Sequence, residues 1–306
     1  MRPGSSQKVL RVGTRRSLLA KAQTQWVIDR ISQMHPELQI EVVEIVTTGD
    51  RVLDRSLTVM AGKGVFVKEI EEKLLAGEID LAVHSMKDLP TDAVPGLVVG
   101  VIPERADPRD VLVTRLSQDL EALPKDAKIG TGSLRRKAQL LRLRPDLHVV
   151  DIRGNIDTRL KKAETDTFDG IILAAAGLAR LGWLHRVQQF LNCEQMVPAV
   201  GQGALGIETR EDDEATRALL APLNHPETET AVKAERVFLA RMGGGCQTPM
   251  AAFCRVQNDR VVLQGFCADE NGERGFRDQV EGSVAEAADL AARLADRLLE
   301  KSQGRE

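Results

Sequence analysis

The feature that most constrains the fold is the repeated order of an apolar strand pattern, a turn containing Gly or Ser, and an amphipathic helical pattern. Residues 10–14 have the first strand pattern, and the helical pattern after it begins at Ser17, a residue type that caps helix N-termini. Strand patterns recur at residues 40–46 and 80–85, and Gly77 ends a helical pattern between them. This alternation predicts an α/β fold in which helices cover a mainly parallel sheet.

Two segments divide this alternation into parts. Residues 104–110 are polar and precede a second series of strand and helix patterns, so we interpret them as a crossing between two domains. Residues 197–210 hold a proline and glycines before an apolar strand pattern, and we interpret them as a second crossing back to the first domain. The remaining residues predict a smaller α+β domain. The expected bounds are residues 1–103 and 204–221 for domain 1, 109–197 for domain 2 and 226–306 for domain 3.

Composition narrows the classes of partner. The formal net charge is −3 and aromatic residues make up 3% of the chain, which disfavours a general nucleic-acid or membrane-binding protein. No run approaches the roughly 18 apolar residues of a membrane-spanning helix, and the first residues lack the apolar core of a secretory signal. We therefore expect a cytoplasmic protein with neither nucleic-acid nor membrane partners, and we expect a monomer.

The second half of the alternation carries a local excess of positive charge, with nine basic and three acidic side chains in residues 131–162. Arg135, Arg136 and Arg153 follow predicted strands, at the edge where open α/β sheets bind ligands. Arg159 lies in the next helical pattern and could face the same way. Guanidinium groups bind carboxylates and phosphates bidentately, so these arginines predict a ligand with several anionic groups. The other basic residues are interpreted as a solvated helix face.

Residues 80–90 form a second candidate site. The predicted strand ends at Ser85, so Lys87 and Asp88 follow at its carboxyl end. A surface ion pair is the ordinary interpretation of these two residues, and His84 is expected to lie in the core. A carboxylate among arginines could instead stabilise a cation that forms during a reaction. At about 4 Å and an effective dielectric constant of about 20, that attraction is worth about 4 kcal/mol, or about a thousandfold in rate.

A third feature is the segment RMGGGCQTP at residues 241–249, where a thiol follows three glycines. Cys246 comes after a predicted helix C-terminus, and no histidine lies within twenty residues, so activation as a nucleophile in every cycle is disfavoured. The other cysteines, Cys193, Cys254 and Cys267, form no metal-binding motif with it, so we expect no metal. Cys246 is then either an inert residue or a covalent attachment point on a permissive loop, and the glycines favour attachment.

The chain also contains nine short motifs whose order is more specific than any one of them. They are GTRRS, GKGVFVKE, DLAVHSMKDLP, DPRD, GTGSLRR, IRGNIDTRL, ILAAAGLARLG, VPAVGQGALGIE and GGGCQTP. With these motifs the chain resembles the porphobilinogen deaminase family, whose members are also called hydroxymethylbilane synthases. The resemblance covers nearly the whole chain.

The resemblance implies a dipyrromethane cofactor joined by a thioether to Cys246. It implies that four porphobilinogen molecules are condensed on this primer with loss of ammonia, and that the linear tetrapyrrole hydroxymethylbilane is released. The implied fold has two doubly wound domains like those of periplasmic solute-binding proteins and a third domain that carries the cofactor loop. A mobile loop at residues 49–66 would include Lys63 and Phe66.

The resemblance also assigns roles to the candidate residues. Asp88 would contact pyrrole N–H groups, stabilise the cation left by loss of ammonia, and assist proton transfer. Gly132 stands where a serine is common, so no side-chain role is expected there, and Val59 stands where some members have a basic residue. The cofactor and substrate carboxylates would be bound by Arg15, Ser17, Ser85, Lys87, Thr131, Ser133, Arg135, Arg136, Arg153, Arg159 and Arg180.

Two other functions remain open from the residues themselves. A non-catalytic binding protein for polycarboxylates would also have two domains, but it would leave porphobilinogen unconsumed. A transferase that uses Cys246 in every cycle would have a free thiol in the resting enzyme. The lack of a secretory signal pattern and the loop with Cys246 argue against the binding protein.

Overall fold

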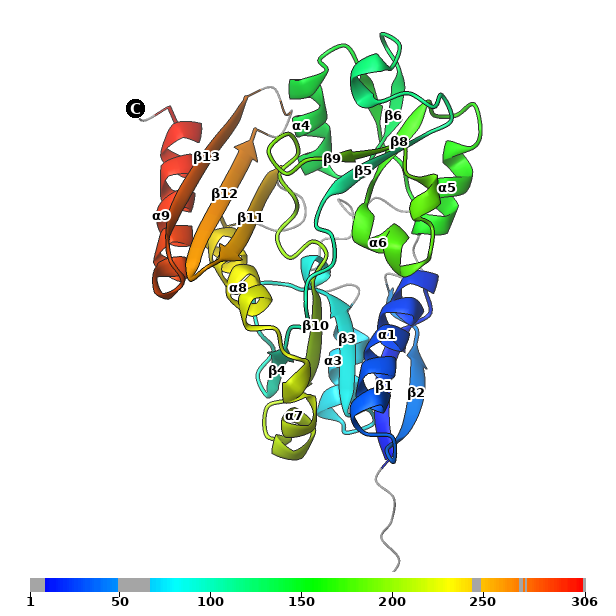
Figure 1. Cartoon of the computed structure of the whole chain (residues 1–306), viewed down its shortest axis with the longest axis vertical. Helices are drawn as coiled ribbons and strands as arrows, with labels where there is room; N and C mark the ends of the chain where they lie inside the picture. Colours follow the sequence, from blue (N-terminus) through cyan, green and yellow to red (C-terminus); the bar gives the residue numbers. More distant parts are fainter. Residues whose placement is uncertain (1–8, 49–66, 244–248, 270–271, 273, 305–306) are drawn as a thin grey trace, which may run out of the picture.

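The computed structural model describes residues 9–48, 67–243, 249–269, 272 and 274–304. These residues form three sheets with covering helices, arranged as two lobes and a smaller third unit (Figure 1). The predicted fold class, two α/β units followed by an α+β unit, is confirmed. The predictions for Lys63, Phe66 and Cys246 concern residues outside the described part.

The first lobe is built on a five-stranded sheet with the order β2-β1-β3-β10-β4. Helices α1 and α7 pack on one face of this sheet, and α3 packs on the other, because alternate residues of each strand are apolar on both sides. The elements are β1 (Val9–Arg15), α1 (Leu18–Met34), β2 (Gln39–Ile45), α3 (Lys68–Leu75), β3 (Leu81–Ser85), β4 (Leu97–Val101), β10 (Leu205–Arg210) and α7 (Glu214–Leu220).

The second lobe has the corresponding sheet order, β7-β6-β8-β5-β9. Helices α5 and α6 cover one face and α4 covers the other, since Val111 and Leu112 of the central strand β5 belong to two separate core clusters. The elements are β5 (Asp110–Thr114), β6 (Lys128–Gly130), α4 (Leu134–Leu143), β7 (His148–Val150), α5 (Ile156–Ala163), β8 (Gly170–Ala174), α6 (Ala175–Arg180) and β9 (Gln189–Leu191).

The described sheets of both lobes are mainly parallel, as predicted, but each contains one antiparallel strand. In the first lobe β10 runs antiparallel to β3 and β4, and in the second lobe β5 runs antiparallel to β8 and β9. Both of these strands follow a crossing between the lobes. The chain enters them at the edge where the other strands end, so they must run in the opposite direction.

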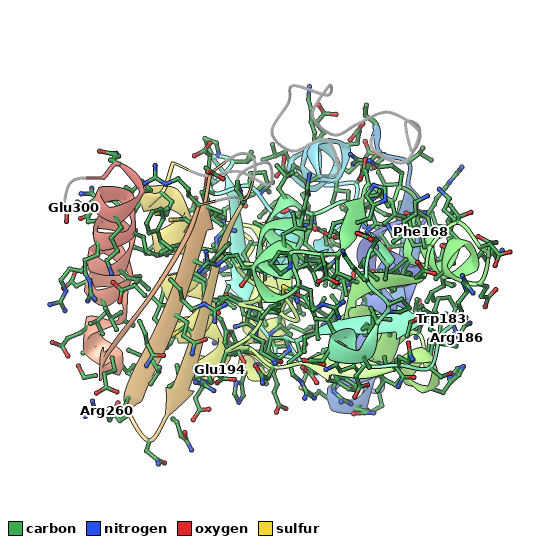
Figure 2. All side chains as sticks on the ribbon, turned by 90° about the horizontal axis from the view of Figure 1, so that it is seen from above. Phe168, Trp183, Arg186, Glu194, Arg260 and Glu300 are labelled. Carbon is green, nitrogen blue, oxygen red and sulfur yellow. The ribbon has the colours of Figure 1, made fainter. Side chains whose placement is uncertain are left out.

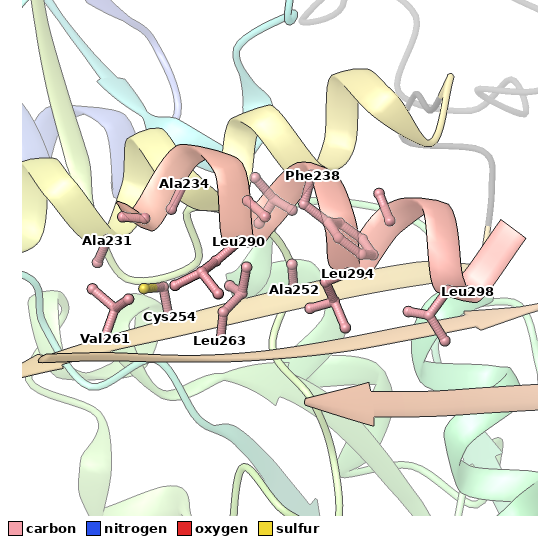
Figure 3. Packing of buried hydrophobic residues seen from close by; sticks show 14 of the residues in the cluster. Ala231, Ala234, Phe238, Ala252, Cys254, Val261, Leu263, Leu290, Leu294 and Leu298 are labelled. Atoms are coloured by element: carbon pink, nitrogen blue, oxygen red, sulfur yellow. The ribbon is translucent and has the colours of Figure 1, made fainter. Parts of the chain in front are cut away.

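The third unit is an antiparallel sheet, β11-β12-β13, covered by helices α8 and α9. Phe238 of α8 and the leucines of α9 fill the space above this sheet (Figure 3). Strand β13 was not predicted, because its exposed and half-buried polar residues lack a clear apolar pattern. The elements are α8 (Pro226–Arg241), β11 (Met250–Gln257), β12 (Arg260–Ala268), β13 (Gly275–Ser283) and α9 (Ala287–Ser302).

Glu235 of α8 joins the third unit to both crossings. Its carboxylate is fully buried and accepts hydrogen bonds from Arg105 Nη1 at 2.6 Å and Nη2 at 3.1 Å. It also accepts from the backbone N–H groups of Gly201, at 2.7 Å, and Cys254, at 2.8 Å. One carboxylate thus links the first crossing, the second crossing and strand β11.

The third unit also packs directly on both lobes. Val232 of α8 lies in an apolar cluster with Met86 and Leu89 of the first lobe. Toward the second lobe, Arg277 of β13 donates to the carbonyl oxygen of Glu194. Figure 2 shows Glu194 next to the third sheet, whereas Phe168 lies toward the opposite side of the molecule. The third unit therefore packs against both lobes, at one side of the molecule (Figure 1).

Candidate functional site

A cleft of about 300 Å³ lies where the two lobes face each other. Its polar lining comes from the carboxyl ends of β1 and β3 in the first lobe and from the segments after β7 and β8 in the second. This is the edge at which open α/β sheets bind ligands. Of the predicted site residues, the cleft brings together Arg15, Ser17, Ser85, Lys87, Asp88, Arg153, Arg159 and Arg180.

The first lobe presents two short turns to the cleft. At the end of β1, Arg15 is half-buried, and Ser17 caps α1 by accepting a hydrogen bond from the Ala20 N–H at 3.2 Å. At the end of β3, Ser85 Oγ accepts from Gln23 Nε2 at 2.8 Å. Because both strands end at the same edge of one sheet, these polar groups face the same space.

Asp88 ends the short 3-10 helix η1 (Met86–Asp88) that follows β3. Its side chain is exposed to the cleft and forms no hydrogen bond with any other described residue. Burial lowers the pKa of the neighbouring Lys87, an effect that the Asp88 carboxylate opposes. The cleft therefore holds a carboxylate that is available to a ligand, next to the half-buried residue Lys87.

The second lobe supplies three arginines. Arg153 Nε donates to the exposed Asp151 carboxylate at 2.6 Å, an ion pair of low stability that a ligand carboxylate can displace. Arg159 Nε donates to the Gly154 carbonyl at 2.7 Å, and Arg180 Nη2 donates to the Gly203 carbonyl at 2.8 Å. These contacts leave most of their guanidinium N–H groups for other partners.

The electrostatics of the cleft favour anions. Among the described residues that line it, five are cations and two, Asp88 and Asp157, are carboxylates. Burial, with smaller repulsion from Arg136 and Arg153, lowers the pKa of Arg159 to about 10, and burial lowers that of Arg180 to about 10. Both groups are still charged at neutral pH, so the cleft has an excess of positive charge that a polycarboxylate would neutralise.

Four predicted residues lie near the cleft but do not line it. Arg135 and Arg136 are buried and donate to the fully buried carboxylate of Asp110, at 2.7 Å in both cases. Ser133 caps α4 by accepting from the Arg136 N–H at 3.4 Å, and Thr131 Oγ1 accepts from the Ser133 N–H at 3.2 Å. Direct ligand contact by these four residues stays a prediction.

Asp110 is the first residue of β5, so this cluster lies beside both crossings. Burial alone would raise the pKa of Asp110, but the charges of Arg135 and Arg136 hold it well below its usual range. Gln202, in the second crossing, donates from Nε2 to Asp110 Oδ1 at 2.9 Å. In this conformation the two arginines therefore join the second lobe to the crossing segments.

Several lining residues were not predicted. Gln23 is buried on the inner face of α1, and its position among apolar residues at helical spacing was the available signal. Leu19 of the first lobe approaches Gly177 of the second, where an added Cβ would lie 3.7 Å from Leu19 Cδ2 and 3.0 Å from Cδ1 of the neighbouring Ile156. That contact between lobes has no signature in the local sequence. His84 is buried, as expected, and its Nε2 lies 3.0 Å from Glu208 Oε2.

The three described cysteines are buried in places unsuited to nucleophilic chemistry. Burial raises the pKa of Cys193 to about 11, that of Cys254 to about 12 and that of Cys267 to about 11. Within the described ranges, no group of three or more His, Cys, Asp or Glu side chains could hold a metal ion. None of the helices described is long and apolar enough to cross a membrane.

Comparison with known proteins gives two family matches. "Porphobilinogen deaminase, dipyromethane cofactor binding domain" matches residues 10–218, and "Porphobilinogen deaminase, C-terminal domain" matches residues 229–300. The porphobilinogen deaminase of Geobacillus kaustophilus (strain HTA426) is 53% identical over 277 residues, which are 90% of this chain and 90% of that protein. That of Trichlorobacter lovleyi (strain ATCC BAA-1151 / DSM 17278 / SZ) is 50% identical over 292 residues, covering 95% and 93%.

Among solved structures, that of the methionine binding protein MetQ aligns with a TM-score of 0.45 at 13% identity, covering 72% of this chain and 92% of that chain. The family matches and the two relatives, by contrast, extend over both lobes and the third unit. The chain therefore belongs to the porphobilinogen deaminase family, transferases that bind a dipyrromethane cofactor and polymerise porphobilinogen in tetrapyrrole biosynthesis.

Proposed function

We propose that this chain condenses four porphobilinogen molecules, with release of ammonia, into hydroxymethylbilane in the cleft between its lobes. The observation that carries the proposal is the convergence of Asp88 with five cationic side chains at that cleft. Each substrate unit brings an acetate and a propionate, so a growing chain needs many cationic partners. Asp88 is the group placed to act on the reacting atoms.

The cleft residues fit a dipyrromethane group. Its carboxylates would be held by Arg15 and Lys87 from the first lobe and by Arg153, Arg159 and Arg180 from the second. When bound, this group supplies the pyrrole carbon from which the product chain begins. We propose that it is attached to Cys246 by a thioether, in a segment outside the described residues.

Asp88 has three roles in this proposal. Its carboxylate accepts hydrogen bonds from pyrrole N–H groups, stabilises the cation that forms when the substrate loses ammonia, and takes up the proton released when aromaticity returns. Its exposure in the cleft, without a hydrogen bond to another described residue, supports these roles. Lys87 beside it binds a substrate carboxylate.

The other polar and basic residues of the site bind and orient carboxylates. Arg15, Ser17 and Ser85 orient carboxylates from the first lobe, and Arg153 and Arg159 do so from the second. The same role extends to Thr131, Ser133, Arg135 and Arg136 if the cluster around Asp110 rearranges toward the ligand.

We also propose the domain bounds of residues 1–103 with 204–221, 109–197 and 226–306. The assignment of the strands to three sheets supports these bounds.

We further propose that the enzyme acts as a cytoplasmic monomer on a small-molecule substrate, without nucleic-acid or membrane partners. A net charge of −3, in a chain whose positive charge is gathered at one cleft, supports a small anionic substrate rather than a nucleic acid. Light scattering during size-exclusion chromatography tests the oligomeric state directly. A mass twice that of the chain would contradict this part of the proposal.

The deciding experiment is the intact mass of the purified protein under denaturing conditions. The expected result is an added mass of two pyrrole units that maps to the peptide containing Cys246. A bare polypeptide mass that stays unchanged after incubation with porphobilinogen would refute the thioether primer. The same incubation distinguishes a binding protein, because only an enzyme consumes porphobilinogen and releases ammonia.

A further inference from the structure

Arg236 is an arginine near the proposed reaction centre that does not line the cleft. It lies in the second half of α8 and is half-buried. Its Nη2 donates to the Pro90 carbonyl at 2.5 Å, and its Nη1 donates to the Leu89 carbonyl at 3.3 Å. Burial disfavours the charged guanidinium and lowers the pKa of Arg236. The two carbonyl dipoles offset part of this cost by accepting its hydrogen bonds.

The carbonyl groups that Arg236 binds belong to the two residues directly after Asp88. On the other side of Asp88, the Met86 N–H donates to the Ala204 carbonyl at 3.1 Å. Within the turn, the Leu89 N–H donates to the Met86 carbonyl at 3.4 Å. The turn that carries Asp88 is therefore held at its start by the second crossing and at its end by Arg236.

Helix α8 contacts this region through one face. Val232 packs in a cluster with Met86 and Leu89, and Glu235 accepts a hydrogen bond from the Gly201 N–H. Val232 and Arg236 are four residues apart, so they lie on the same side of the helix. The helix continues to Arg241, and Cys246 follows five residues later in the sequence. The turn with Asp88 is thus braced against the same helix that leads toward the attachment cysteine.

We infer that Arg236 is a positioning residue which, through the carbonyl groups of Leu89 and Pro90, sets the place of the Asp88 carboxylate relative to α8. This inference rests on the proposed function, because it assumes that Asp88 acts on the reacting atoms. An arginine suits the role, since its planar fork donates to two neighbouring carbonyl groups at once. A lysine would keep the charge but lacks the planar fork that donates to both carbonyl groups, and a glutamine would lose the charge.

The test compares Arg236→Gln, Arg236→Lys and a control, Lys233→Gln, in holoenzyme whose cofactor content is checked by intact mass. Lys233 lies on the same helix, and among the described residues its exposed side chain pairs only with Glu229, at 2.6 Å. We expect Arg236→Gln to lower kcat by about 10- to 100-fold, as for loss of a charge-assisted hydrogen bond, with KM within about threefold. Arg236→Lys should recover part of this loss, and Lys233→Gln should match wild type.

A double variant separates positioning from general damage. If Arg236 acts through Asp88, adding Arg236→Gln to Asp88→Asn should leave the slow residual single-turnover rate unchanged. A further loss equal to that of Arg236→Gln in wild type would overturn the inference, as would a kcat for Arg236→Gln equal to that of Lys233→Gln. Should Arg236→Gln not accumulate as folded holoenzyme, Arg236→Lys is put through the same cycle and judged by the same outcomes.

The same experiment distinguishes a wrong proposed function from a wrong role for Arg236. If wild-type holoenzyme does not consume porphobilinogen, the proposed function is wrong. If wild type turns over and Asp88→Asn retains the wild-type rate, only the role proposed for Asp88 is wrong. In either case the role of Arg236 is wrong as well. If wild type turns over and Asp88→Asn does not, the comparison of Arg236→Gln with Lys233→Gln decides the role of Arg236 alone.

Discussion

Replacing Glu235 by glutamine tests whether one buried carboxylate holds the third unit to both crossings. Glu235 accepts four hydrogen bonds, two from Arg105 and one each from the N–H groups of Gly201 and Cys254. The Arg105 side chain is only 10% exposed, so a neutral glutamine leaves a mostly buried guanidinium without its counter-charge. Removing one partner of a buried pair costs about 3–5 kcal/mol.

The assay is urea unfolding followed by two probes, far-UV circular dichroism and tryptophan fluorescence. Trp26 lies in the first lobe and Trp183 follows α6 in the second, so fluorescence reports on both lobes. We expect Glu235→Gln to lower the free energy of unfolding by about 3 kcal/mol or more and to separate the two probes, because the units would then unfold less cooperatively.

The matched control is Glu194→Gln. Glu194 pairs with Arg255 at 3.3 Å, but both side chains are about half exposed, so its loss should change stability by less than about 1 kcal/mol. The double variant Glu235→Gln/Arg105→Met should lose less free energy of unfolding than the sum of the losses in the two single variants, because it leaves no unpaired charge buried. If Glu235→Gln costs no more than Glu194→Gln, the reasoning about the crossing is refuted.

Three further predictions concern the site and its support. Asp88→Asn should lower kcat by about a thousandfold with an unchanged melting temperature, the loss expected for one cation-stabilising carboxylate; a near-normal rate would exclude Asp88 from the chemistry. Arg153→Ala should slow chain extension by about 10- to 100-fold, the effect of one lost charge-assisted bond, and intermediates resolved by mass should accumulate; a normal distribution would contradict this. Asp110 has a depressed pKa in the folded state, so its stabilisation is present above the unfolded pKa of about 4 and is lost as the pH falls toward the folded pKa. The stability gap between wild type and Asp110→Asn, measured by urea unfolding, should therefore narrow by about 1 kcal/mol from pH 5 to pH 3, and a constant gap would show that Asp110 does not titrate differently on folding.

The sequence predicted those features that depend on local patterns. Strand β1, the cap at Ser17 and the turn at Gly77, whose φ is +66°, follow from residue types at fixed spacing. Arg15 and Arg153 line one cleft because open α/β sheets bind ligands at the carboxyl ends of their strands, and both residues lie at or just after such strand ends. Here a short motif and its place on the sheet were sufficient.

What the sequence could not predict depends on tertiary pairing. Arg135 and Arg136 occupy the expected turn, yet their guanidinium groups bind Asp110, which lies 25 and 26 residues earlier in the chain. Whether a guanidinium at such a turn binds a ligand or a buried carboxylate is decided by which acid the fold places beside it. Gln23 was missed for the same reason, because its partner Ser85 is 62 residues away.

The burial of the three described cysteines has a practical consequence for counting cofactor. With pKa values of about 11 or 12 and little exposure, Cys193, Cys254 and Cys267 hold almost no thiolate near pH 8. A mild disulfide reagent added to the folded protein should therefore leave them unlabelled. The only remaining cysteine in the chain is Cys246, so the fraction of protein that reacts reports how much of it lacks a covalent adduct at that residue.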